Sequence, residues 1–217
     1  MFDLHQAALG TFDERLLESE RFHMSAGKVH ETLNVLAGDL DRAGIDYAVM
    51  GAMALNAHGY NRETTDVDVL VRPDGLVAFR ERFVGRGYTE KFQGARKSFK
   101  STQTGVTVEF LTTGEYPGDG KPKPVAFPDP ATAYIEVRGV KVVTLQKLIE
   151  LKLASGMTQP SRMRDLSDVQ DLIRTLNLPD TFAEQLSPYV RDTFLTLHGQ
   201  VQLPDPHVER PEGNPTP

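Results

Sequence analysis

The chain has 217 residues, of which 39% are hydrophobic and 25% are charged, and its formal net charge is −6. These values are ordinary for a water-soluble protein of one domain, or of one domain with a small appendage. The absence of cysteine excludes disulfides and thiolate metal sites. The negative charge argues against nucleic-acid binding over the whole surface.

The beginning of the chain lacks a basic segment followed by an apolar one, and no apolar run approaches the roughly 18 residues of a membrane span. We therefore expect a cytoplasmic protein without membrane contact. Residues 1–24 are polar and mixed, with a short helix expected at 13–20 and no functional interpretation. Apolar residues at helical spacing predict a helix over 28–43, which Gly44 ends and which packs behind the first strand.

The next stretch predicts a short buried strand at 47–50, a tight turn at Gly51 and Ala52, and a short helix at 52–58 that Gly59 ends. A glycine-led turn into a helix presents free backbone N–H groups and the positive end of a helix dipole. Both features suit a phosphate group.

Two acids, Asp66 and Asp68, lie in the strand predicted at 66–71. Strand side chains alternate between faces, so both acids project to one side, roughly 6.5 to 7 Å apart. Neighbours on one strand share one environment, whereas a general acid and base need different ones. Mg²⁺ is held by one or two carboxylates together with waters and substrate phosphates. The pair predicts a site for a nucleotide with Mg²⁺ or Mn²⁺, although an isolated D-x-D pair is more often a solvated strand end.

The order of strand, small-residue turn, helix, loop and D-x-D strand resembles the signature of the nucleotidyltransferases of the DNA polymerase β superfamily. The matching residues are Met50, Gly51 and Ala52, followed by Asp66 and Asp68. The loop 62–65 resembles the branch that contains stand-alone minimal enzymes and abortive-infection toxins. The family usually has Gly or Ser where this chain has Ala52, so backbone donation to a triphosphate is retained and a hydroxyl contact is lost.

The segment after this strand is basic. It predicts a helix from Pro73 to about residue 84 and two strands at 96–101 and 104–111, joined near residues 102–103. Between residues 72 and 100 there are eight Lys and Arg residues against three acids. The segment from Arg80 to Lys100 could therefore hold a polyanion beside the site, or it could be a solvated helix and hairpin.

Glu109 lies inside the second of these strands, among apolar residues, where an unpaired carboxylate is costly. The resemblance implies that it is the third metal-site carboxylate. The alternative is an ion-paired or edge-strand glutamate. Five prolines between residues 114 and 130 then predict a long surface loop.

Two further strands are expected at 133–137 and 140–143, followed by a helix from residue 145 to about 155 with Thr144 as its N-cap. Lys152 lies on the apolar stripe of this helix, where an ammonium group facing the protein needs an anion such as a phosphate. The alternative is a lysine that extends to solvent or pairs with an acid at the edge of the core. The resemblance to the toxin branch implies that Lys152 and an acid of the next helix help form the nucleotide pocket. Asp165 flanks the apolar stripe of that helix and Asp168 lies farther round, so both are candidates.

The predicted fold is α/β, a small mixed β-sheet nucleotidyltransferase core at 1–143 with a helical C-terminal part at 144–202. That part includes helices expected at 162–177, 180–186 and 189–197, and a disordered tail is expected at 203–217. The resemblance implies transfer of a nucleotide from an NTP to an acceptor hydroxyl. Asp66, Asp68 and Glu109 would be the catalytic and metal-binding residues, and the nucleotide would contact a set of residues drawn from several elements: Gly51, Ala52, Arg62, Thr65, Lys152, Asp165 and Asp168.

The acceptor that we favour is RNA, such as tRNA, bound through the basic segment, because that segment would repel a cationic small molecule. A role in a toxin–antitoxin pair, with a cognate protein partner, follows from the same resemblance. Two alternatives stay open. The chain could be an inert nucleotide-binding or partner-binding module, for which Ala52 is the one hint, or it could modify a protein or a small molecule.

Overall fold

The computed structural model describes residues 27–203. Residues 27–43 are helical. The helices and strands that follow are β1 (Tyr47–Val49), α2 (Gly51–Ala57), β2 (Asp66–Val71), α3 (Pro73–Phe83), β3 (Tyr88–Glu90), β4 (Ser98–Ser101), β5 (Thr107–Thr112), β6 (Tyr134–Val137), β7 (Val140–Val143), α4 (Leu145–Thr158), α5 (Met163–Leu176) and α6 (Pro188–Gln202). Two short 3₁₀ helices lie at Pro160–Arg162 and Asp180–Gln185.

The strands form one mixed sheet in the order β3-β4-β5-β2-β1-β7-β6. The pairs β2 with β5 and β1 with β7 are parallel, and the other neighbours are antiparallel. This arrangement confirms the predicted α/β class with a mixed sheet. It also places β2, which carries the D-x-D acids, between β1 and β5.

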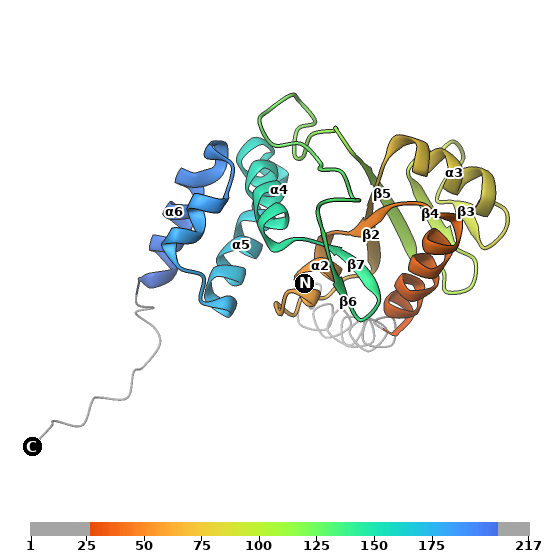
Figure 1. Cartoon of the computed structure of the whole chain (residues 1–217), viewed down its shortest axis with the longest axis horizontal. Coiled ribbons are helices and arrows are strands. Elements are labelled where there is room, and N and C mark those ends of the chain that lie inside the picture. Colours follow the sequence, from red (N-terminus) through yellow and green to blue (C-terminus); the bar gives the residue numbers. More distant parts are fainter. Residues whose placement is uncertain (1–26, 204–217) are drawn as a thin grey trace, which may run out of the picture.

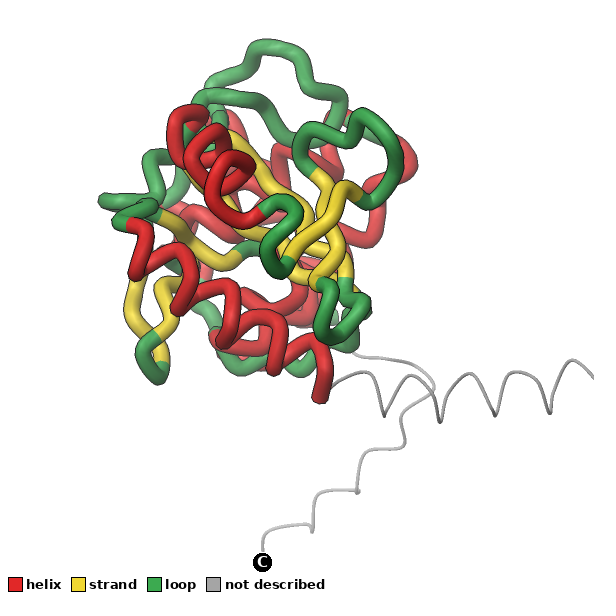
Figure 2. Tube along the Cα trace, turned by 90° about the vertical axis from the view of Figure 1, so that its right-hand side faces the viewer, coloured by secondary structure: helices red, strands yellow, loops and turns green. Residues whose placement is uncertain are grey.

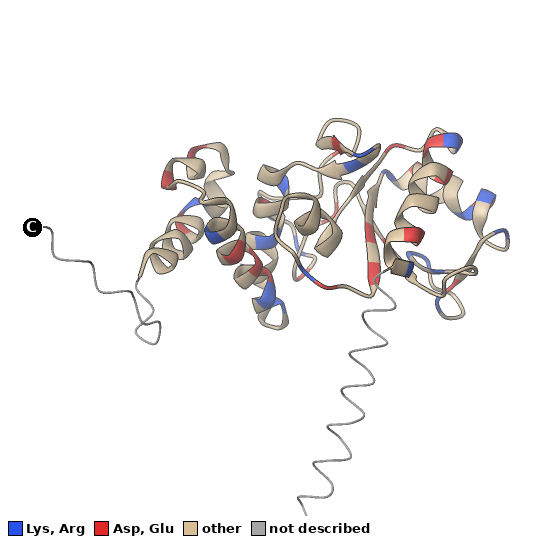
Figure 3. Ribbon diagram, turned by 90° about the horizontal axis from the view of Figure 1, so that it is seen from below, with Lys and Arg blue, Asp and Glu red and all other residues tan. Residues whose placement is uncertain are grey.

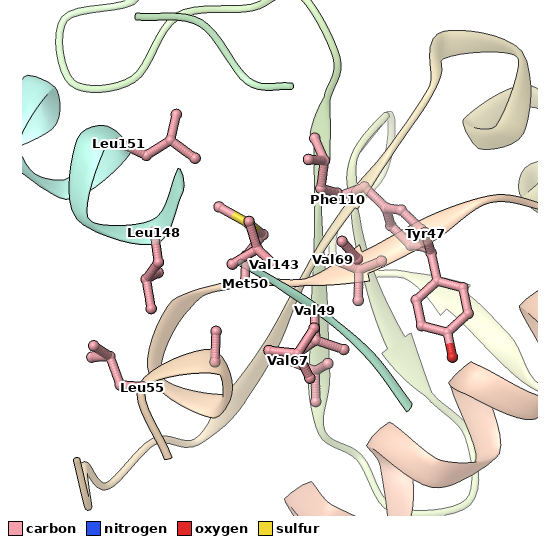
Figure 4. Packing of buried hydrophobic residues seen from close by; sticks show 14 of the residues in the cluster. Tyr47, Val49, Met50, Leu55, Val67, Val69, Phe110, Val143, Leu148 and Leu151 are labelled. Carbon is pink, nitrogen blue, oxygen red and sulfur yellow. The ribbon is translucent and has the colours of Figure 1, made fainter. Parts of the chain in front are cut away.

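One face of the sheet is apolar and is covered by the N-terminal helix and α3. Val67 and Val69 on β2 belong to this face, and Figure 4 shows them beside Val49 and Phe110. Phe79 of α3 packs on the Phe110 ring with the centroids 4.5 Å apart. Because side chains alternate along β2, the burial of these valines directs the two acids to the opposite face.

The three C-terminal helices lie beside the sheet, as Figure 1 shows, and α4 packs against both α5 and α6. Thr144 caps α4 as predicted, because its side chain accepts a hydrogen bond from the Lys147 N–H. Helix α5 ends at Asn177, which has the left-handed conformation common at helix ends (φ 48°). The tube view of Figure 2 shows the helices around the strands from a second direction. No helix within residues 27–203 has both the length and the apolar character needed to cross a membrane.

Several predicted boundaries differ from the structure. Strand β3 was not predicted, because its three residues are too few to show alternation and, unlike those of β1, do not form an apolar run. The turn before β5 is longer than expected, since Gly105 donates to the Ser101 carbonyl and adopts a φ of +76°. Residues 180–185 form a 3₁₀ helix, and the last helix extends to residue 202. The expected helix at 13–20 and nearly all of the expected tail lie outside the described residues.

Candidate active site

The D-x-D acids lie on β2 next to the start of α2. The Met50 N–H donates to the Asp68 carbonyl at 2.9 Å, which ties the two segments together. Gly51 has a φ of +59°, and a Cβ atom built on it would lie 1.9 Å from Asp68 Oδ2. Glycine is therefore required here twice, for its backbone conformation and for the close approach of the carboxylate.

Burial raises the pKa of the Asp68 carboxyl to about 6, and the negative charges of Asp66 and Glu109 act in the same direction. Lys152 and Arg162 lower this pKa and only partly offset the increase. The negative charge of Asp68, the inner acid of the pair, is therefore incompletely balanced by the protein, as expected for a site that takes a cation.

Asp66 is the outer acid of the pair, and Thr64 holds it. The Thr64 hydroxyl donates to Asp66 Oδ1 at 2.5 Å. Thr65, which the resemblance assigned to the nucleotide, is exposed beside it and remains a prediction. Sequence reasoning missed Thr64, although a hydroxyl residue two positions before an acid is a local hydrogen-bonding signal.

Glu109 lies on the same face as the two acids, in register with Asp68 across the β2–β5 pair. Its carboxylate is engaged by two neighbours. Lys91 donates to Oε1 at 2.8 Å, and the Ser98 hydroxyl donates to Oε2. The hydrogen bond to Glu109, and then the charge of that carboxylate, raise the pKa of Lys91. The expected third carboxylate is thus close by, but it is turned toward a cation and a hydroxyl of the chain itself.

The side chains available to hold a metal ion are consequently the two carboxylates of Asp66 and Asp68. Within residues 27–203 no group of three or more His, Asp or Glu side chains is placed to hold a metal ion. Asp66 and Asp68 satisfy the lesser requirement of Mg²⁺, which binds one or two carboxylates and keeps waters and phosphate oxygens as its other ligands. The incompletely balanced charge of Asp68 agrees with this donor set. The metal-binding role of Glu109 remains a prediction.

Lys152 forms a buried ion pair with both acids that sequence reasoning left open. Its ammonium group donates to Asp165 Oδ1 at 2.9 Å and to Asp168 Oδ2 at 2.7 Å. The side chains of Lys152 and Asp168 are only 8% and 3% exposed. Asp168 was expected farther from the apolar stripe of α5, yet it is the more buried of the two acids because it faces Lys152. Their contact with a nucleotide remains a prediction.

Arg62 connects this ion-pair cluster to the loop that precedes β2. Its guanidinium group donates to Asp168, while its Nε is buried without a hydrogen-bond partner. Asn56 on α2 holds the Arg62 backbone from both sides, by accepting from its N–H at 2.5 Å and donating to its carbonyl at 3.0 Å. The Tyr60 hydroxyl donates to Asp171 on α5 at 2.8 Å. The loop that carries Arg62 is thus fixed to α5, next to the acids of β2.

Ala52, the residue that departs from the family pattern, is buried (7% exposed). Its methyl group therefore packs in the protein, and any contact that residues 51–52 make with a ligand has to use the backbone. Backbone donation by Gly51 and Ala52 remains a prediction.

The basic segment does not form a face of one sign. Figure 3 shows Lys and Arg residues interleaved with acids at the end of the molecule that holds α3. Four of its eight basic residues form ion pairs with acids of the chain, namely Arg72, Arg80, Lys91 and Lys97. Arg86, Arg96 and Lys100 are exposed and have no ion pair within the described residues. The basic face expected from the sequence is therefore smaller than predicted.

A cavity of about 780 Å³ lies on the other side of the loop. Its walls include Val29 and Leu33 of the N-terminal helix, Val49 of β1 and Val142 of β7, and it reaches the loop at Arg62. These valines belong to the apolar side of the sheet, whereas Asp66 and Asp68 face the other side. We therefore place the chemistry at the acids and not in this cavity.

No protein-family model matches this sequence, and no curated protein matches it. Several solved structures resemble the fold. An antigenic nucleotidyltransferase-like protein from Paracoccidioides brasiliensis has a TM-score of 0.52 and 19% sequence identity, with 80% of this chain and 88% of that chain covered. ANT(2″)-Ia in complex with adenylyl-2″-tobramycin has a TM-score of 0.48 and 12% identity, with coverages of 78% and 98%. A protein from H. pylori named as a candidate nucleotidyltransferase has a TM-score of 0.44 and 16% identity, with coverages of 80% and 92%.

At these sequence identities the similarity concerns the fold alone. It rests on the protein from Paracoccidioides brasiliensis, whose TM-score is 0.52. The mixed sheet and the surrounding helices agree with that likeness. The chain therefore has a nucleotidyltransferase fold.

Proposed function

We propose that this protein is a metal-dependent nucleotidyltransferase that moves a nucleoside monophosphate from an NTP to an acceptor hydroxyl and releases pyrophosphate. One observation carries the proposal. Asp66 and Asp68 project from the same face of β2, and the inner acid has a raised pKa because its buried charge is incompletely balanced. Such a pair needs a cation, and Mg²⁺ together with the phosphates of a nucleotide supplies one.

Each residue of the site has a role in this proposal. Asp66 and Asp68 would hold Mg²⁺ or Mn²⁺, which supplies charge stabilisation for the attacking and leaving oxygens when bound. Glu109 would accept the proton of the acceptor hydroxyl, after exchanging its present partners Lys91 and Ser98 for the acceptor. The backbone at Gly51 would contact the triphosphate.

The two cations of the ion-pair cluster, Arg62 and Lys152, would stabilise the triphosphate charge from the side of α4 and α5. Their carboxylate partners Asp165 and Asp168 hold them in position between the helices and the loop. Phosphoryl transfer depends mainly on such positioning and on electrostatic stabilisation, and requires little covalent chemistry from the protein.

Calorimetric titration with Mg²⁺ and each of the four NTPs, followed by a pyrophosphate-release assay, tests this function. We expect Mg²⁺-dependent binding of at least one NTP in the wild type and no such binding in Asp68→Asn. Binding without pyrophosphate release across RNA, protein and small-molecule acceptors would instead identify an inert nucleotide-binding module. Unchanged nucleotide affinity in Asp68→Asn would overturn the site.

For the acceptor we propose RNA, in keeping with a toxin of a toxin–antitoxin pair. The support is limited to the exposed cations Arg86, Arg96 and Lys100, of which Lys100 lies on the same face of β4 as Ser98, the register partner of Glu109. Incubation with total RNA and labelled NTPs should label RNA. Labelled protein bands without labelled RNA would exclude RNA as the acceptor and leave the nucleotidyl-transfer reaction in place.

A further inference from the structure

Four neighbouring positions form a row across the sheet on the face that carries the acids. Asp68 on β2 pairs with Glu109 on β5, Glu109 pairs with Ser98 on β4, and the Lys91 N–H, just beyond β3, donates to the Ser98 carbonyl. Adjacent strands lie about 4.8 Å apart, so Ser98 is about two strand spacings from Asp68, with Glu109 between them. The side chain of Ser98 is thus directed toward the candidate site.

The Ser98 hydroxyl has a specific partner. It donates its proton to Glu109 Oε2, while Lys91 occupies Oε1 of the same carboxylate. In a nucleotidyl transfer the nucleophile is a hydroxyl whose proton is taken by a nearby carboxylate, and the two groups must lie within hydrogen-bond reach. Ser98 and Glu109 satisfy that requirement without any external acceptor.

We propose that Ser98 is an internal acceptor, so that the protein nucleotidylates its own β4 strand. The inference rests on the proposed function, because it uses the same NTP site. Ser98 Oγ attacks the α-phosphorus of the bound NTP, and a new Oγ–P bond forms. The bond from this phosphorus to the oxygen bridging the β-phosphate breaks, pyrophosphate leaves, and the Ser98 proton passes to Glu109. No oxidant, reductant or further substrate is needed.

Other hydroxyl groups nearby are less suitably placed. The Thr64 hydroxyl already donates to Asp66, one of the two acids that face the cation. Ser101, also on β4, is buried and belongs to the opposite face of the strand. Thr89 lies opposite Lys100 in a separate row of the same face and contacts no acid of the site. Ser98 is the hydroxyl bound to the carboxylate that would accept the proton.

The modified product would also block the site. A nucleotide attached to Ser98 lies against Glu109, where an RNA hydroxyl or any other acceptor would have to enter. The added phosphodiester carries a negative charge beside Glu109 and could be balanced by Lys91, which is already within hydrogen-bond distance of that carboxylate. Self-modification would therefore limit transfer to other acceptors.

The primary test is mass spectrometry of the intact full chain after incubation with Mg²⁺ and each NTP in turn. We expect a mass increase of one nucleotidyl group, located by peptide mapping at Ser98, with release of pyrophosphate. Ser98→Ala should lose the adduct, and the matched variant Thr89→Ala should keep it. An adduct at another residue, or pyrophosphate release to external acceptors without any adduct at Ser98, overturns the inference while the proposed function stands. If the protein shows no Mg²⁺-dependent nucleotide binding, both this inference and the proposed function are wrong.

A second test does not depend on turnover. The chain has no cysteine, so Ser98→Cys creates a unique thiol that can be labelled with iodoacetamide. We expect Mg²⁺ with a non-hydrolysable NTP analogue to slow this alkylation, whereas the same ligand should not affect a thiol introduced by Thr89→Cys. Equal alkylation of Ser98→Cys with and without the nucleotide would show that position 98 lies away from the bound nucleotide, and would refute the role of Ser98.

Discussion

The buried charge of Asp68 makes a quantitative prediction about the metal-free protein. Its folded pKa is raised from 3.8 to about 6. A raised acid pKa favours the protonated folded state, so the contribution of Asp68 to stability is most favourable below pH 3.8 and falls as the pH rises to about 6. Two pKa units correspond to at most about 3 kcal/mol of destabilisation at neutral pH. We therefore expect Asp68→Asn, a neutral isostere, to stabilise the metal-free fold by about 1–3 kcal/mol at pH 7.5.

Thermal unfolding with EDTA at pH 7.5 and at pH 4.5 measures this effect. A gain of 1 kcal/mol raises the Tm by about 2–4 °C for a chain of this size. The gain should fall to about a third at pH 4.5, where folded Asp68 is protonated but the unfolded chain is still mostly ionised at this position, and it should vanish only well below pH 3.8. Mg²⁺ with an NTP should raise the Tm of the wild type but not that of Asp68→Asn. The control Asp192→Asn, on the exposed surface of α6, should change neither value. An equal or lower Tm of Asp68→Asn at pH 7.5 would refute the argument of a buried, incompletely balanced charge.

Three further perturbations test other parts of the site. Lys152→Ala should destabilise the protein by at most about 3–5 kcal/mol in urea unfolding, because buried Asp168 then keeps only Arg62 as an ion partner and half-buried Asp165 loses its ion pair; an unchanged midpoint would contradict the ion-pair cluster. Gly51→Ala should abolish Mg²⁺-dependent nucleotide binding in calorimetry, because its Cβ atom would collide with the Asp68 carboxylate. The control Gly85→Ala, at a position with a similarly positive φ and open space around it, should retain binding. In filter-binding assays RNA affinity should fall steeply with salt, and the slope should decrease when Arg96 and Lys100 are both changed to Ala; equal slopes would exclude phosphate contacts there.

Local signals were sufficient to predict most of the sheet and the position of the D-x-D acids. Asp66 and Asp68 alternate with buried valines, and this period of two determines their common face before any tertiary contact is known. The glycine at position 51 was also evident from the sequence. What could not be seen was that its missing Cβ makes room for Asp68, because the residues are 17 positions apart and meet only after β1 and β2 pair.

Apart from the local hydrogen bond of Thr64 to Asp66, the contacts that sequence reasoning missed join distant segments. The sequence pattern predicts Lys91 to be part of a basic face, but the β3–β4 hairpin brings its ammonium group to Glu109, which balances that charge. Likewise, helical spacing showed that Lys152 needs an anion but could not distinguish a ligand phosphate from the two acids of α5. Such pairings are determined by the register between strands and the packing between helices. The residue pattern of a single segment gives no information on either.

Strand β1 lies inside the sheet, yet its two partners come from distant parts of the chain. Val49 pairs with Val69 on one side and with Val142 on the other. During synthesis β7 is the last of the described strands to emerge, so until then one edge of β1 has no partner. Pairing across such a long separation slows folding, and an open edge can pair with another chain. A nascent or truncated chain that ends before Val140 would therefore expose an apolar strand from the middle of the sheet. Pairing of the β6–β7 hairpin with β1 covers this edge and so protects the protein from aggregation.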